Sequence, residues 1–75
     1  MDKLTKIEAG LLYGLKQFEM PAEEAAIISV FLEEDDQVLM IDFLASHPEA
    51  TRKEILDEFD RLLIQRKRLK NSSEN

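Results

Sequence analysis

Few side chains in this sequence have the chemistry of a catalytic or metal-binding group. His47 is the only histidine, and the chain has no cysteine. Residues 33–36 (Glu-Glu-Asp-Asp) place four carboxylates in a row, and such a run raises the possibility of a hard-cation site. Calcium loops, however, space their ligands and include a turn glycine, and both features are missing here. We therefore interpret the run as a solvated linker whose last residue, Asp36, caps the following helix.

His47 precedes Pro48, and this pair predicts the end of a helix. We interpret the imidazole as a partner of the helix dipole or as an exposed side chain. Paired acid and base catalysis would need a pocket that holds two titratable groups at a defined separation. The sequence predicts no such pocket, so we expect no catalytic, cofactor-binding or metal-binding residue and no enzymatic activity.

Basic residues gather at the end of the sequence. Residues 1–60 carry 15 acidic and 5 basic side chains, a net charge of −10, whereas residues 61–75 carry 1 acidic and 5 basic, a net charge of +4. An acidic body opposes nucleic-acid phosphates, so only this last segment could attract them. The nucleic-acid candidates are Arg61, Arg66, Lys67, Arg68 and Lys70.

These five bases scatter around a helix instead of lining one face, as a groove-reading helix requires. The simpler interpretation is that they solubilise the end of a helix that is longer than the core. Alternatively, Arg66 lays its aliphatic stem over the core and projects its guanidinium group outward.

The elements that position these residues are predicted to be helices. The chain has 75 residues, of which 44% are hydrophobic and 35% charged, with two Gly and two Pro. This composition is typical of a small helical domain. Apolar spacing of three and four residues predicts an all-α bundle. Its four predicted helices cover approximately residues 2–18, 21–32, 36–47 and 52–70.

The third helix is the predicted centre of the bundle. Residues 37–47 (QVLMIDFLASH) are apolar around almost the whole helical circumference, so that protein must surround this helix. Thr51 to Glu54 match the capping-box pattern at the start of the fourth helix. We expect residues 1–70 to form one domain and residues 71–75 to be a disordered polar tail.

Self-association is predicted from a surplus of apolar surface. The second helix is also apolar over most of its circumference, with Ser29 as its polar break. Two glycines one turn apart in the first helix suggest close approach of a neighbouring helix, from the same chain or from a second copy. The self-association candidates are Gly10, Gly14, Ile27, Ile28, Phe31 and Ile64.

The segment FLASHPEATRKEIL is similar to the opening of helix-turn-helix and winged-helix domains, with the similarity extending from Val38 to about Phe59. The resemblance implies DNA binding through a later recognition helix. Here no turn is predicted after Ile55 and Leu56, and the helical pattern continues through residues 61–70.

We therefore expect a small, acidic, non-enzymatic intracellular protein that acts as a protein–protein interaction or homo-oligomerisation module, with a second copy in a homodimer or another protein as its partner. It needs no cofactor and has no membrane or small-molecule partner. The absence of an apolar leader or membrane span predicts a cytoplasmic location. The alternative is an accessory DNA-binding protein that uses its basic C-terminal helix.

Overall fold

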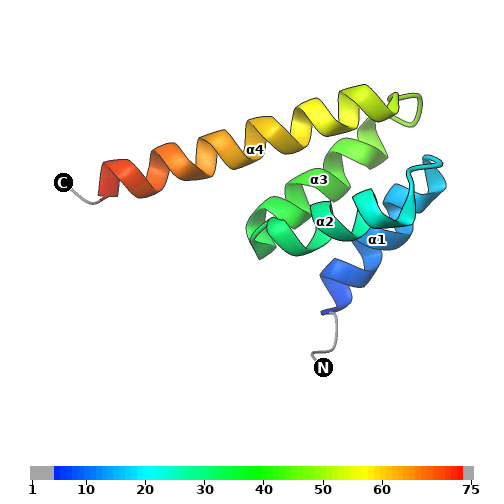
Figure 1. Ribbon diagram of the computed structural model, residues 1–75, viewed down its shortest axis with the longest axis horizontal. Coiled ribbons are helices and arrows are strands. Elements are labelled where there is room, and N and C mark those ends of the chain that lie inside the picture. The colour runs from blue at the N-terminus through cyan, green and yellow to red at the C-terminus, as the bar shows by residue number, and fades with distance from the viewer. Residues whose placement is uncertain (1–4, 74–75) are drawn as a thin grey trace.

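A computed structural model shows four helices, and it describes residues 5–73, with side chains described for residues 5–70. The helices are α1 (Lys6–Gln17), α2 (Ala22–Phe31), α3 (Glu34–Ser46) and α4 (Arg52–Ser73). The described residues contain no strand, which confirms the predicted all-α bundle. In Figure 1, α1, α2 and α3 form a compact body, and α4 crosses it and continues beyond it.

Helix α1 begins with a capping box that was not predicted from the sequence. The Glu8 backbone N–H donates to the Thr5 hydroxyl at 3.0 Å, and the Thr5 N–H donates to the Glu8 carboxylate at 2.8 Å. These bonds satisfy donors that a helix start leaves free, and so they fix Lys6 as the first helical residue. The predicted start near residue 2 lies outside the described residues. The helix ends at Gln17, and Glu19 then takes a left-handed backbone conformation with φ of 62°.

The link between α2 and α3 differs from its prediction. Helix α3 begins at Glu34, two residues before the predicted start, and its N-cap residue is Glu33. Asp36 is therefore inside the first turn, where its side chain is buried. The prediction that Asp36 caps α3 is wrong. The chain turns earlier because Leu32 is buried in the core and already leaves the α2 helix.

Gln37 holds this link together. Its side-chain Nε2 donates to the carbonyl oxygens of Ser29 at 2.6 Å and Leu32 at 3.0 Å. A helix leaves its last carbonyl groups without backbone partners. The buried amide of Gln37 supplies two of those partners, so α3 caps the C-terminal end of α2 across the link.

Helix α3 packs against both α1 and α4, as expected of the predicted central helix, and side chains of all four helices form the core. Gly14 of α1 lies against α3, because a Cβ built on it would be 3.4 Å from Leu44 Cδ1. The enclosure of α3 is incomplete, since Val38 and Leu39 are exposed. The core side chains are Leu11, Leu15, Met20, Ala25, Ile28, Leu32, Met40, Leu44, Ile55 and Leu62.

Helix α4 starts as predicted and ends later. The Thr51 N–H donates to Glu54 at 2.8 Å and the Glu54 N–H donates to the Thr51 hydroxyl at 3.2 Å, which confirms the predicted capping box. The helix runs to Ser73, three residues past its predicted end at about residue 70. Residues 74–75 of the predicted polar tail lie outside the described residues.

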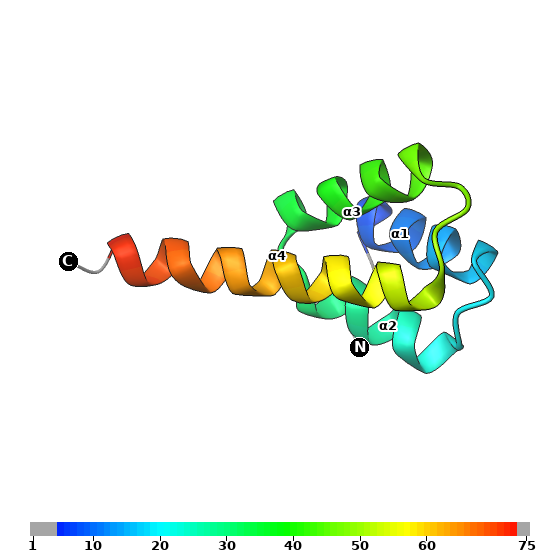
Figure 2. The same ribbon diagram turned by 90° about the horizontal axis from the view of Figure 1, so that it is seen from above.

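Residues 64–73, here called the arm, extend past the body in two perpendicular views (Figures 1 and 2). Of its residues up to Lys70, all except Arg66 are exposed. No helix among the described residues is both long enough and apolar enough to cross a membrane.

Candidate functional site

One face of α2 carries a continuous row of exposed apolar side chains, here called the α2 stripe. It consists of Ala26, Ile27, Val30 and Phe31. Positions three and four residues apart share a helix face, so these four side chains form one surface. Val30 is 59% exposed and Phe31 is 66% exposed. Among the described residues, α2 therefore exposes three large apolar side chains, more than any other helix.

The opposite face of α2 packs against the body. Ala25, Ile28 and Ser29 are buried against the body, and the Ser29 hydroxyl donates to the Ala25 carbonyl oxygen at 2.8 Å. At the start of the helix, the Glu24 carboxylate pairs with the guanidinium group of Arg52 on α4. Hydrogen bonding to Arg52 lowers the pKa of Glu24 below its ordinary value. Both ends of α2 are thus attached to neighbouring helices.

The structure divides the predicted self-association residues. Ile27 and Phe31 belong to the α2 stripe, whereas Ile28 is 1% exposed and lies in the core, so it cannot contribute to an outer surface. Gly14 serves the contact between α1 and α3 within one chain. Gly10 is exposed, and a Cβ built on it would meet no atom within 4 Å.

Ile64 is 54% exposed but does not extend the α2 stripe. It is two residues after the buried Leu62 and therefore lies about 160° away from it around α4. Its neighbours one turn away are charged, Asp60 before it and Arg68 after it. Ile64 is thus an isolated apolar side chain.

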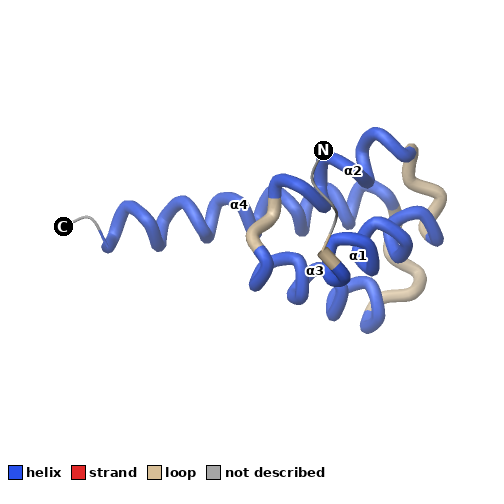
Figure 3. Tube along the Cα trace, turned by 90° about the horizontal axis from the view of Figure 1, so that it is seen from below, coloured by secondary structure: helices blue, strands red, loops and turns tan. Residues whose placement is uncertain are grey.

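Two of the five nucleic-acid candidates are held by the acidic link between α2 and α3. Arg66 donates to both carboxylate oxygens of Asp36, at 3.2 and 3.3 Å, and its Nη1 lies 3.6 Å from Glu33. The hydrogen bond to Asp36 raises the pKa of Arg66 above its ordinary value. Lys70 lies 3.4 Å from the second Glu33 oxygen. Figure 3 shows this link at the edge where α4 leaves the body.

The pairing between the link and α4 was not predicted, because the two partners are 30 residues apart in sequence. The alternative of an outward-projecting Arg66 is wrong, since its guanidinium group faces Asp36 over the core edge. Arg61 pairs with Glu58 on the same helix. Lys67 and Arg68 make no ion pair with any described residue, and they lie about 100° apart around α4.

The helix-turn-helix resemblance finds limited support in the geometry. The turn between α3 and α4 is present at residues 47–51, but α4 is one unbroken helix through Ile55 and Leu56 to Ser73. No separate recognition helix follows within the described residues.

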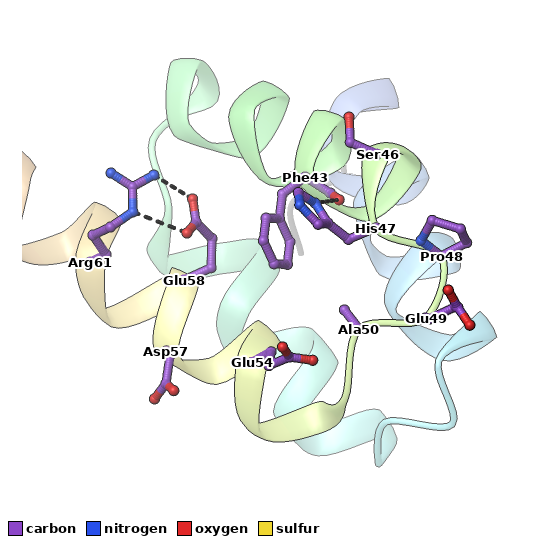
Figure 4. A pocket seen from close by; sticks show the side chains of 10 residues that line it. All are labelled: Phe43, Ser46, His47, Pro48, Glu49, Ala50, Glu54, Asp57, Glu58 and Arg61. Carbon is purple, nitrogen blue, oxygen red and sulfur yellow. Dashed lines mark hydrogen bonds and ion pairs between the residues drawn. The ribbon is translucent and has the colours of Figure 1, made fainter.

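A hollow of about 530 Å³ lies at the corner between α3 and α4. Figure 4 shows the Phe43 ring stacked against His47, with ring centres 4.5 Å apart. His47 Nδ1 lies 3.0 Å from the Phe43 carbonyl oxygen, an acceptor, so this nitrogen carries the hydrogen. Glu58 points toward Arg61 and away from the imidazole.

Glu49, Glu54, Asp57 and Glu58 line the same hollow, but among the described residues none of these carboxylates forms a hydrogen bond or an ion pair with His47. Elsewhere among the described residues, no group of three or more His, Cys, Asp or Glu side chains is placed to hold a metal ion. The α2 stripe, rather than a pocket, is the candidate functional site.

Comparison of the chain with models of known protein families, with curated proteins and with solved structures finds no match in any of the three.

Proposed function

We propose that this chain is a non-enzymatic protein–protein interaction module that forms a homodimer through the α2 stripe. The observation that carries the proposal is the exposure of contiguous apolar side chains on a helix whose opposite face is fixed in the core. Burial of a Val, Ile or Phe side chain contributes about 1.5–3 kcal/mol relative to exposure.

A second copy is the simplest partner for this surface. A two-fold axis lets the same patch serve both chains, and two-fold dimers are the commonest closed assemblies. A chain of 75 residues has a small core, and burial of the stripe would add to its stability.

Light scattering coupled to size exclusion tests the proposal. We expect a mass of about twice 8.7 kDa at tens of micromolar chain. Val30→Glu places a charge in the centre of the stripe and should give a folded monomer. Tyr13→Glu is the matched control, because Tyr13 is 68% exposed on α1, outside the stripe, and should leave the dimer intact.

Helical circular dichroism accompanies each mass measurement, so that loss of the dimer is distinguished from loss of the fold. A monomeric wild-type mass with a cooperative thermal transition would refute the proposal. Equal dissociation by Val30→Glu and Tyr13→Glu would show that the α2 stripe is not the contact.

A further inference from the structure

The apolar side of α4 continues past the body that covers it. Ile55, Leu62 and Leu69 follow one another at intervals of seven residues, which place them on the same side of a helix. Ile55 and Leu62 are buried, whereas Leu69, in the arm, is 57% exposed. Leu69 is thus a core-type side chain that its own body leaves largely uncovered, although Arg66 and Lys70 beside it pair with the link between α2 and α3.

The α2 stripe alone is too small for a stable interface. A ten-residue helix is about 15 Å long and about 10 Å wide, a footprint on the order of 150 Å². Stable interfaces bury about 800 Å² on each partner. A dimer through α2 therefore needs a second element from each copy, and the arm is the projecting element that the described chain offers.

The opposite charges of the arm and the body favour packing of the arm against the body of a second copy. The arm carries four basic residues and no acidic one, whereas residues 5–63 carry 14 acidic and 5 basic residues, a net charge of −9. In the arm, Lys67 and Arg68 make no ion pair with a described residue. Glu23, at the start of the helix that bears the stripe, is likewise exposed and makes none.

The arm and the stripe also adjoin within one chain. Phe31 of the stripe, Leu63 at the base of the arm and Lys67 line one notch of about 250 Å³. Because the two elements share an edge, a single two-fold axis near this notch can bring both arms onto both stripes.

We propose that in the dimer the arm of each copy lies across the α2 stripe of the other, with Leu69 facing Val30 of the second copy. This inference rests on the proposed homodimer and specifies its geometry. The second copy thereby covers Leu69 and the stripe together, and the basic arm lies over an acidic body.

Disulfide trapping between single-cysteine variants tests the geometry, because the chain has no native cysteine. Full-length Val30→Cys and Leu69→Cys chains are mixed and exposed to a mild oxidant. A disulfide requires Cα atoms about 4.4–6.8 Å apart. We expect the mixture to give a disulfide-linked dimer between the two different chains. Leu69→Cys mixed with Tyr13→Cys is the control and should give at least tenfold less.

A second pair of variants compares the two sides of the arm. Leu69→Glu should raise the dimer dissociation constant at least tenfold. Ile64→Glu, at a residue of similar exposure on the other side of the helix, should change it less than threefold.

The outcomes separate the inference from the proposed function. A monomeric wild type refutes both. A dimer that Leu69→Glu and Ile64→Glu weaken equally, or that cross-links mainly as Leu69→Cys or Val30→Cys homodimers, refutes the crossed-arm geometry alone.

Discussion

Replacement of Gln37 by Met should destabilise the chain far more than its position next to an acidic link suggests. Gln37 is buried, and its amide donates to the Ser29 and Leu32 carbonyl oxygens at 2.6 and 3.0 Å. Methionine has a similar length and an equally good helix propensity but no donor. Each neutral hydrogen bond contributes about 0.5–1.5 kcal/mol, so the loss of two should cost about 1–3 kcal/mol.

Thermal and urea unfolding at one fixed chain concentration measure this cost, because self-association makes the melting temperature depend on concentration. For a domain of this size, a loss of about 2 kcal/mol lowers the melting temperature by about 8–16 °C. Gln17→Met makes the same substitution at an exposed position and should have little effect. A Gln37→Met variant as stable as Gln17→Met would refute the idea that α3 caps α2.

The two capping boxes predict that Thr51→Ala and Thr5→Ala each cost about 0.5–2 kcal/mol in chemical denaturation, and an unchanged midpoint would contradict the observed helix starts. Gly10→Ala should raise stability by about 0.5–1 kcal/mol, because its Cβ meets open space, whereas Gly14→Ala should gain less against α3, and denaturation of both variants checks the order. Hydrogen bonding to the Thr51 backbone N–H lowers the pKa of Glu54 below its ordinary 4.5. The stabilisation by this carboxylate is therefore complete above that value and is lost as the pH falls through the lowered pKa, so Glu54→Gln should flatten the acid limb of a stability–pH profile.

Local patterns predicted the helices well because apolar spacing and capping boxes involve only residues within one or two turns of each other. The apolar spacing located all four helices, and the Thr51 to Glu54 box located the start of α4. The box from Thr5 to Glu8 has the same sequence signature and could have been found in the same way. Its recognition would have moved the first helix to its observed start.

The link between α2 and α3 was not predictable from local patterns. Asp36 and Gln37 look like a helix cap and a polar interruption, because their neighbours in sequence give no other role. Their actual partners are Arg66, 30 residues away, and the Ser29 carbonyl, eight residues away. Such contacts depend on how α4 and α2 meet, and helix periodicity does not contain that information.

The candidate surface on α2 was only partly predictable, again because local patterns do not contain the contacts between helices. Periodicity showed that α2 has too many apolar residues for one neighbour, but not which of them face the body. Ile28 and Ile27 are adjacent residues of the same type, and only the packing decides that Ile28 is buried and Ile27 exposed. The exposed face became defined once the position of the body against α2 was known.

The ion pairs of α4 favour the interaction module over the alternative of nucleic-acid binding. A phosphate backbone would have to compete with Asp36 for Arg66 and with Glu33 for Lys70, which leaves Lys67 and Arg68 as the bases of the arm without a described ion pair. Two phosphate contacts give a salt slope of about −1.8, so affinity falls roughly 60-fold for each tenfold rise in salt. The apolar contact of the α2 stripe has no such dependence, and salt weakens only the arm's charge contribution to the dimer. A salt titration therefore separates apolar burial from phosphate attraction in one protein. Dissociation of nucleic-acid complexes at a salt concentration where the dimer mass persists would favour the interaction module.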